Sequence, residues 1–329
     1  MKPFALSLSL LLAFCLSLHC LTLTSTADDE AKKLSAELEA AKKKLTEARV
    51  TLQYKFAKGE TLHWKVEHLG ATETTIQGNT QTSESRSVST KVWQITGVDS
   101  KGNMTVTHSV ANVDMWQKLS DRPEIRFNSK TDKTAPPEYE NVAKTIGVPL
   151  TTLTFASDGT IVKRGTSLRQ ANLGLGDLVM LLPPKPVKVG SRWHEPAEIR
   201  IRQKDGRQKT IKTRKQYTLK KIETGVATIS VETQVLTPVN NSTIKSQLVQ
   251  QLTNGTIKFD IDAGRILKKE MEWDESVVGF NGADSMMKYV ARYTEEMQSV
   301  TTADAGDTKD AAGTTARANP TDRPALRRR

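Results

Sequence analysis

Apolar and polar residues alternate in short runs along most of the chain between residues 51 and 300. In one run, Leu62, Trp64 and Val66 alternate with His63 and Lys65. Such alternation places every second side chain on one face of an extended strand. Glycine-containing turn sequences separate the runs, at residues 58–59, 101–103, 158–159, 205–206, 254–255 and 263–264. The pattern predicts a mainly β fold: a curved antiparallel sheet or half-barrel of roughly a dozen strands joined by hairpins.

This predicted β domain, residues 51–300, divides into two similar halves, at about 51–165 and 187–300. Each half has a glycine before a tryptophan-bearing strand, then a hairpin, then a phenylalanine followed by Gly-x-Ile. These residues are Gly59, Trp64, Phe155 and Gly159 in the first half and Gly190, Trp193, Phe259 and Gly264 in the second. The shared order indicates an internal duplication, and the general composition of β proteins is the alternative explanation.

Two short helices are expected within the β domain. One is predicted at Pro137–Ile146, before Gly147 and Pro149. The other is predicted at Leu175–Leu182, before Pro183-Pro184, in the apolar segment 168–186 that joins the two halves.

Residues 1–27 have the pattern of a secretory signal peptide. Lys2 precedes an uncharged apolar run, and small residues end at Ala27 before the acidic residues that begin at Asp28. The segment predicts export to the periplasm or the extracellular space; the alternative is an uncleaved membrane anchor. Cleavage at Ala27 would remove Cys15 and Cys20, which are the two cysteines of the chain.

The ends of the mature chain differ in character from the β domain. Residues 28–50 place leucine and alanine at alternating spacings of three and four, which predicts an amphipathic helix. This helix would either dock on the β domain or form a short coiled coil, and docking is favoured because alanine weakens the seam. Residues 301–329 have little apolar content, so we expect a disordered tail.

The sequence contains no recognisable catalytic, metal or cofactor motif. The histidines at 63, 68, 108 and 194 lack the spacing of a zinc site. In Trp193-His194-Glu195, neighbouring side chains on a strand would point to opposite faces, which argues against a catalytic pair. Asp260 and Asp262 immediately precede a turn, where solvated acids are common. We therefore expect a protein without enzymatic activity, metal or cofactor; a hydrolase with a dispersed site is an alternative.

A ligand-binding function is the leading hypothesis. A concave β face can hold an apolar or amphipathic ligand such as a lipid. Aromatic side chains and the apolar segment between the halves are the candidates for lining or covering the cavity. These residues are Trp64, Trp93, Trp193, Leu178, Met180 and Leu181.

A basic run offers a second hypothesis. Residues 200–221 form a predicted hairpin with one acidic residue, Asp205, and the chain as a whole has a formal net charge of +11. Such a hairpin would dock on an anionic envelope polymer, although basic residues also protect edge strands. The candidate anion-binding residues are Arg200, Arg202, Lys204, Arg207, Lys209, Lys212 and Arg214. Few aromatic residues lie between these charges, so nucleic acid is not an expected partner.

One stretch resembles a known family. Leu182–Trp193, which reads LPPKPVKVGSRW, resembles a recurring motif in a family of secreted bacterial β-rich proteins of unknown function. Lys58-Gly59-Glu60 and the segment from Phe259 to Ile266 are similar to its other recurrent pieces. The family's architecture is loosely similar to half-barrel lipoprotein carriers of the bacterial envelope. The resemblance implies a β fold but assigns no functional residue.

Overall fold

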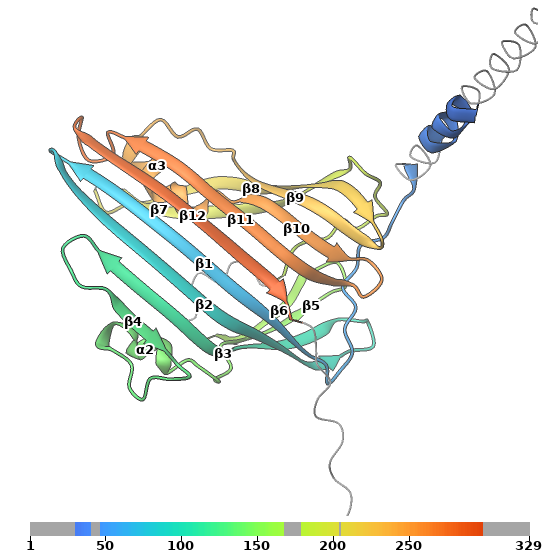
Figure 1. Ribbon diagram of the computed structural model, residues 1–329, viewed down its shortest axis with the longest axis horizontal. Coiled ribbons are helices and arrows are strands. Elements are labelled where there is room, and N and C mark those ends of the chain that lie inside the picture. Colours follow the sequence, from blue (N-terminus) through green and yellow to red (C-terminus); the bar gives the residue numbers. More distant parts are fainter. Residues whose placement is uncertain (1–29, 41–46, 168–178, 204, 299–329) are drawn as a thin grey trace, which may run out of the picture. The chain divides into compact units, whose positions relative to one another are not determined.

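A computed structural model describes residues 30–40, 47–167, 179–203 and 205–298. It contains one open antiparallel sheet of twelve strands, which curves around its own inner face (Figure 1). The predicted mainly β fold is therefore confirmed. The strands are β1 (Thr61–Ile76), β2 (Asn79–Val98), β3 (Met104–Leu119), β4 (Ile125–Asn128), β5 (Thr151–Phe155), β6 (Ile161–Ser167), β7 (Arg192–Arg202), β8 (Gln208–Glu223), β9 (Val226–Val235), β10 (Asn254–Asp260), β11 (Arg265–Val278) and β12 (Ser285–Met297).

Helices are few and short. The helix predicted near residue 137 is present as η1 (Pro137–Tyr139) followed by α2 (Glu140–Ala143). Two further helices, α3 (Ser242–Leu248) and η2 (Val249–Gln251), have no counterpart among the predicted ones. The side chain of Asn241 caps α3 by accepting a hydrogen bond from the amide of Ile244.

The predicted N-terminal helix is observed at residues 30–40. Leu34 and Leu38 of its apolar stripe are 69% and 54% exposed, so these two side chains are not covered by the β domain. Docking of the helix stays a prediction. No helix in the described part of the chain is long and apolar enough to cross a membrane. The signal segment and the tail lie outside the described residues.

The strand order determines how the chain fills the sheet. The order is β6-β5-β3-β2-β1-β12-β11-β10-β9-β8-β7, with β4 paired to β3. The first half of the chain thus runs outward from the middle to one edge. The second half starts at the opposite edge and returns, so that β12 pairs with β1, with Trp64 opposite Met297 and Ile76 opposite Ser285. The segment between β6 and β7 must therefore connect the two edges of the sheet.

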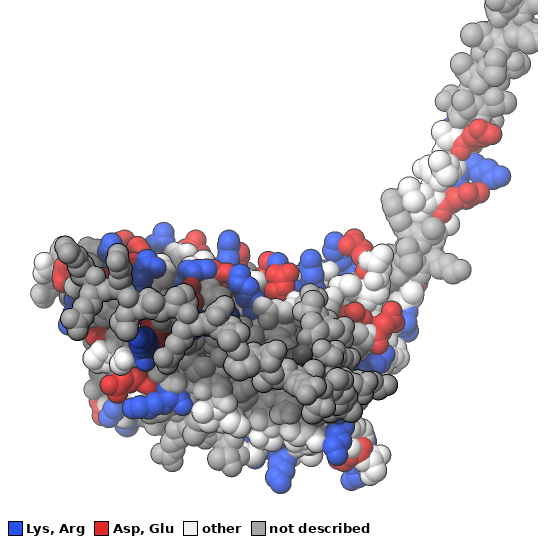
Figure 2. Space-filling model, turned by 60° about the horizontal axis from the view of Figure 1, so that its bottom comes forward, with Lys and Arg blue, Asp and Glu red and all other residues white. Residues whose placement is uncertain are grey.

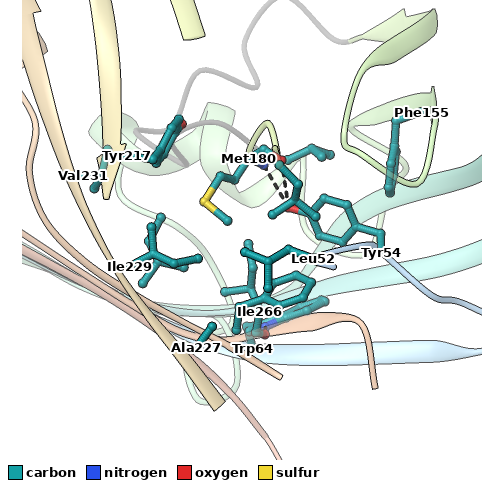
Figure 3. Close-up of a cluster of buried hydrophobic side chains, with 14 of the residues drawn as sticks. Leu52, Tyr54, Trp64, Phe155, Met180, Tyr217, Ala227, Ile229, Val231 and Ile266 are labelled. Atoms are coloured by element: carbon teal, nitrogen blue, oxygen red, sulfur yellow. Dashed lines mark hydrogen bonds between the residues drawn. The ribbon is translucent and has the colours of Figure 1, made fainter. Parts of the chain in front are cut away.

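Two segments outside the strands pack on the inner face, and we call them the straps. The first is residues 50–56 and the second is residues 179–187. They are joined by a pair of backbone hydrogen bonds between Val50 and Val187. Leu52 and Tyr54 of the first strap and Met180 of the second are buried in the main core (Figure 3). Leu182 of the second strap belongs to the same core.

The helix predicted at Leu175–Leu182 is wrong where it can be compared. Residues 175–178 lie outside the described residues, and residues 179–182 are not helical. The Tyr54 hydroxyl bonds both the amide and the carbonyl of Met180, at 3.0 and 3.2 Å. The amide of Leu182 donates to the carbonyl of Asp158 at 2.7 Å. These backbone groups therefore find partners in other segments instead of within a helical turn.

The two halves share a hydrogen-bond pattern that supports the proposed duplication. Gly59 donates to the carbonyl of Ile95, and Ile95 donates back to Glu60. In the second half Gly190 donates to Leu219, and Leu219 donates back to Ser191. The first set of hydrogen bonds joins the start of β1 to β2, and the second joins the start of β7 to β8. Corresponding residues of the two motifs therefore make corresponding hydrogen bonds.

The repeated turn glycines lie against the straps. Gly159 has φ of +84° and its missing Cβ would lie 2.3 Å from the carbonyl oxygen of Met180. Gly264 has φ of +63° and a Cβ there would lie 2.6 Å from the carbonyl oxygen of Gln53. Each turn needs glycine both for its backbone conformation and for close approach to a strap.

We predict that Gly159→Ala destabilises the protein more than Gly102→Ala. Both glycines have a left-handed backbone, which costs alanine about 1–2 kcal/mol. A Cβ on Gly102 meets nothing within 4 Å, whereas one on Gly159 overlaps the second strap. The overlap should lower the free energy of unfolding by roughly a further 1–3 kcal/mol. Urea unfolding of both variants measures the difference, and equal destabilisation would show that the strap is not held there.

Candidate functional site

A cavity of about 730 Å³ lies beside the core on the inner face of the second half. Its size is within the range of sites that hold a single small molecule. Strands β7–β12, His68 of β1, and Val179 and Met180 of the second strap contribute to its wall. The apolar part of the wall comprises Val179, Met180, Ala197, Ile199, Val231, Ile257, Met271, Trp273 and Tyr289. Polar groups are present as well, and the two lysines among them are Lys215 and Lys269.

A buried charged cluster adjoins this cavity. Lys91 and Glu295 are each 1% exposed and form an ion pair. The other carboxylate oxygen of Glu295 accepts a hydrogen bond from the Tyr293 hydroxyl at 2.6 Å. Lys269 lies directly opposite Glu295 on the neighbouring strand, with 3.6 Å between Nζ and Oε2. Two lysines therefore share one carboxylate in the protein interior.

The cluster perturbs the pKa of its members. Burial alone would raise the pKa of Glu295, but the positive charges of Lys269 and Lys91 and the hydrogen bonds lower it to about 2. Burial lowers the pKa of Lys91 to about 8, because one carboxylate compensates that ammonium only in part and Lys269 repels it. Glu295 is the ionised centre that holds the cluster together.

Two of the tryptophans predicted to line the cavity, Trp64 and Trp93, instead contact this cluster. The ammonium of Lys91 lies 4.5 Å from the ring centre of Trp64 and 5.0 Å from that of Trp93. Both rings are buried in the core and do not contribute to the cavity wall. They stabilise the buried cation through its attraction to the aromatic faces.

A second polar position lies at β7 and β8. The Tyr217 hydroxyl donates to Glu195 at 2.7 Å, and the ring of Tyr217 stacks on Trp193. Lys215 lines the cavity one inward-facing position away on the same strand. Burial, and after it the charge of Lys269, lowers the pKa of Lys215 to about 8. The strand register places Glu195 of β7 directly opposite Lys215.

Two histidines face the inner side of the sheet. His68 lines the cavity beside Trp273, and burial lowers its pKa. His108 is buried next to the cluster, and burial followed by repulsion from Lys91 lowers its pKa to about 4. Its Nε2 atom has no hydrogen-bond partner in the described structure. Both rings are thus disposed to be neutral at neutral pH.

The other residues predicted to line the cavity lie in different parts of the structure. Met180 lines the cavity. Trp193 is buried and donates its indole N–H to the carbonyl of Leu181 at 2.8 Å, while Leu181 itself is half-buried. Leu178 lies outside the described residues. Of the five predicted residues that the structure describes, Met180 lines the cavity.

Sequence reasoning missed the lysines of the cavity and the cluster, although a signal was present. Lys91 has the same strand parity as Trp93 and Ile95, and Lys215 has that of Tyr217 and Leu219. A lysine at an inward position of an otherwise apolar strand face is uncommon, since lysine is seldom buried without a partner. Lysines at inward strand positions are therefore the sequence signal that could have indicated this site.

The basic hairpin forms as predicted, and its charges divide between two faces. Arg200, Arg202, Lys212 and Arg214 project from the outer face of β7 and β8. Lys209 has the opposite parity, and Arg207 pairs with Asp205 in the turn. Lys204 lies outside the described residues. Elsewhere the surface carries both signs of charge, as the view in Figure 2 shows.

The other clusters considered in the sequence do not form sites among the described residues. His194 is exposed on the outer face while Glu195 points inward, as the strand alternation predicts. Asp260 accepts a hydrogen bond from the amide of Ala263 within its own turn. No group of three or more potential metal ligands occurs in the described ranges.

Residues 171–266 match the model of a family of unknown function (DUF6263). The match includes the second strap and β7–β10, and with them Met180, Lys215 and Tyr217 of the cavity. The resemblance to an uncharacterised family is therefore confirmed for this part of the chain. No curated protein matches the chain. The resemblance to lipoprotein carriers stays an analogy of architecture.

We predict that Glu295→Gln lowers the free energy of unfolding by about 3–5 kcal/mol at pH 6, because it leaves buried lysines without their carboxylate. The folded-state pKa of Glu295 lies below its ordinary value, so its stabilisation is complete above about pH 4.5 and is lost as the pH falls toward 2. The difference in free energy of unfolding between the wild type and Glu295→Gln should therefore decrease as the pH falls from about 4.5 toward 2. Urea unfolding from pH 6 to pH 2.5 measures it.

Glu272→Gln is the matched control for this experiment. Glu272 lies on β11 and pairs with Arg292 at 3.1 Å, but both side chains are 66% exposed. Its substitution should change the stability by less than about 1 kcal/mol at any of these pH values. A stability gap for Glu295→Gln that does not change with pH would contradict the role assigned to the Glu295 carboxylate.

Proposed function

We propose that the protein is an exported, non-enzymatic binding protein that holds one apolar or amphipathic small molecule in the inner-face cavity. The observation that carries the proposal is the cavity itself, which is walled on one side by Met180 and Val179 and on the other by the sheet. Its wall combines a large apolar area with a few polar groups, as is typical of small-molecule sites.

The neighbouring elements favour a cavity that keeps its form. The two straps are fixed to each other at Val50 and Val187 and to the hairpin turns through Gly159 and Gly264. They pack in the main core, and Val179 and Met180 of the second strap also contribute to the cavity wall together with β7–β12. A wall held by strands and straps is preorganised, which reduces the entropy lost when a ligand binds.

The catalytic alternative has less support. His194 and Glu195 face opposite ways, and His108 is absent from the cavity wall. His68 does line the cavity, but its ring lies against Trp273, 6.5 Å between ring centres. A general base needs a partner or substrate proton within hydrogen-bond reach. The described geometry offers binding groups more readily than a catalytic pair.

We predict that Ala197→Trp weakens ligand binding at least tenfold. Ala197 is an inward residue of β7 on the cavity wall, so an indole there would occupy ligand volume. An environment-sensitive fatty acyl dye, titrated with the purified protein, measures the affinity. His194→Trp is the matched control, since it places the same ring on the outer face of the same strand. The proposal is wrong if the wild type binds no apolar probe and purifies without a bound lipid.

The outer face of β7 and β8 supports a second candidate function, docking on an anionic polymer. Arg200, Arg202 and Lys212 are exposed there and Arg214 is half-exposed. Glu198, opposite Lys212, is the one acid among the outward residues of β7. A one-sided cationic surface attracts polyanions at low ionic strength.

We predict that replacing Arg200, Arg202, Lys212 and Arg214 by glutamate abolishes retention on an immobilised acidic polysaccharide in low salt. The effect follows from reversal of four charges on one face. Replacement of Arg122, Lys130, Lys144 and Lys163 by glutamate is the control, since it changes the net charge equally at other positions. Equal loss of retention in both variants would show that net charge, and not this face, governs the interaction.

A further inference from the structure

The sheet has a gap at the start of β10. This strand begins at Asn254, which pairs with Glu232 of β9 and Glu272 of β11. Both neighbours run on beyond that point, β9 for residues 233–235 and β11 for residues 273–278. The ends of β9 and β11 therefore flank a position at which one strand is missing from the sheet.

A groove of about 450 Å³ occupies this gap. Val235 of β9 lines one side of it, and residues 275–277 of β11 line the other. Apolar residues of α3, η2 and the position after η2 line it as well: Leu248, Val249 and Leu252. Val249 packs against Val277 in a core cluster, which places these residues on the inner side of the sheet. The groove thus has strand edges on two sides and an apolar base.

The edge of β11 beside the groove has unused hydrogen-bonding groups. Alternate residues of a strand direct their N–H and C=O groups to the same side. On one side β11 pairs with β12 as far as Val278. On the other side, beyond β10, the backbone of residues 273–278 makes no hydrogen bond to any described residue. Such an edge is a template for the addition of a further strand.

The outer side of the gap is acidic. If the register of β10 is continued past Thr253, the first outward residue of an added strand lies between Gln234 and Asp274. Glu232 and Glu272 are then its diagonal neighbours, which long side chains can reach. Asp274 and Glu232 are exposed and form no ion pair with a described residue, while Glu272 pairs with an arginine of β12. An arginine of β8 bonds Gln234 from the other side of β9. A basic residue at the outward position would meet three carboxylates.

We propose that the gap binds an extended segment of a partner polypeptide in which basic and apolar residues alternate. The segment would run antiparallel to β9 and β11, and its backbone would pair with the unused groups of β11. Its apolar side chains would lie on Leu248 and Val249, and a basic side chain would face Asp274. Addition of a strand to a sheet edge is a recurring mode of peptide recognition.

The described chain does not supply this segment itself. Ile199–Arg202 has the required alternation, but it is already paired with β8, and Ile199 and Ile201 pack in a core cluster with residues of α3. The groove is also distinct from the inner-face cavity. Gln250 and Gln251 line that cavity, whereas Leu248 and Val249 line the groove. The proposed partner site is therefore independent of the ligand proposed for the cavity.

The test uses a fluorescent hexapeptide in which lysine and valine alternate, titrated with the purified full chain and followed by fluorescence anisotropy. We expect it to bind at least tenfold more tightly than the same peptide with glutamate in place of lysine. Two further peptides carry N-methyl groups on the valines or on the lysines, which removes backbone donors. At least one of them should bind tenfold more weakly. Equal binding of all four peptides, or no binding of the lysine peptide, would overturn the proposal.

Hydrogen exchange and variants locate the site. The bound peptide should slow amide exchange in residues 273–278. Val235→Trp fills the groove and should weaken the lysine peptide at least tenfold, and Asp274→Lys should weaken it equally and strengthen the glutamate peptide. Circular dichroism checks the fold of each variant.

The matched controls are Val162→Trp and Asp121→Lys, which make the same changes at exposed positions outside the groove. Equal loss of binding in these controls, or unchanged exchange of residues 273–278 in the bound protein, would refute the assignment. Self-association of the wild type that Val235→Trp abolishes would overturn the choice of partner and assign the gap to a second copy of the chain.

Discussion

The meeting of β1 with β12 is the constraint on which the rest of the structure depends. Because the last strand pairs with the first, the two halves of the chain lie on opposite sides of this β1–β12 seam. The chain must then pass from the edge at β6 to the edge at β7. The described part of this connection, the second strap, packs on the inner face, and backbone buried there has to satisfy its polar groups. Tyr54, Asp158 and Val50 supply those partners to the second strap.

The same seam creates the buried cluster. Glu295 lies on β12, with Val66 opposite on β1 and Lys269 opposite on β11. Lys91 reaches it from β2, across β1. An ion pair this deep gains little net stability compared with apolar residues of similar volume, because desolvation offsets the attraction. Its effect is on register: a shift of one residue at the seam would turn Glu295 outward and leave the lysines without their carboxylate.

Alternation and turn glycines predicted the strands well because both are local signals. The parity of Leu62, Trp64 and Val66 is fixed by the geometry of one strand. The order of strands in the sheet is not local, so the sequence could not bring Lys91, Lys269 and Glu295 together. The second strap shows the same limit. Its apolar run and following prolines are compatible with a helix, and partners distant in the chain, Tyr54 and Asp158, decide its conformation.

The basic residues of the chain occupy two different kinds of position, and edge protection explains only one of them. Strand β7 lies at an edge of the sheet and carries Arg200, Arg202 and Pro196, all of which hinder pairing with another strand. Edge protection therefore accounts for that surface even without a polyanion. It does not account for Lys215 and Lys269, which point to the inner face away from any edge. Buried lysines weaken a fold unless something compensates their charge. Glu295 lies opposite Lys269 and pairs with it, and Glu195 lies opposite Lys215 on the neighbouring strand.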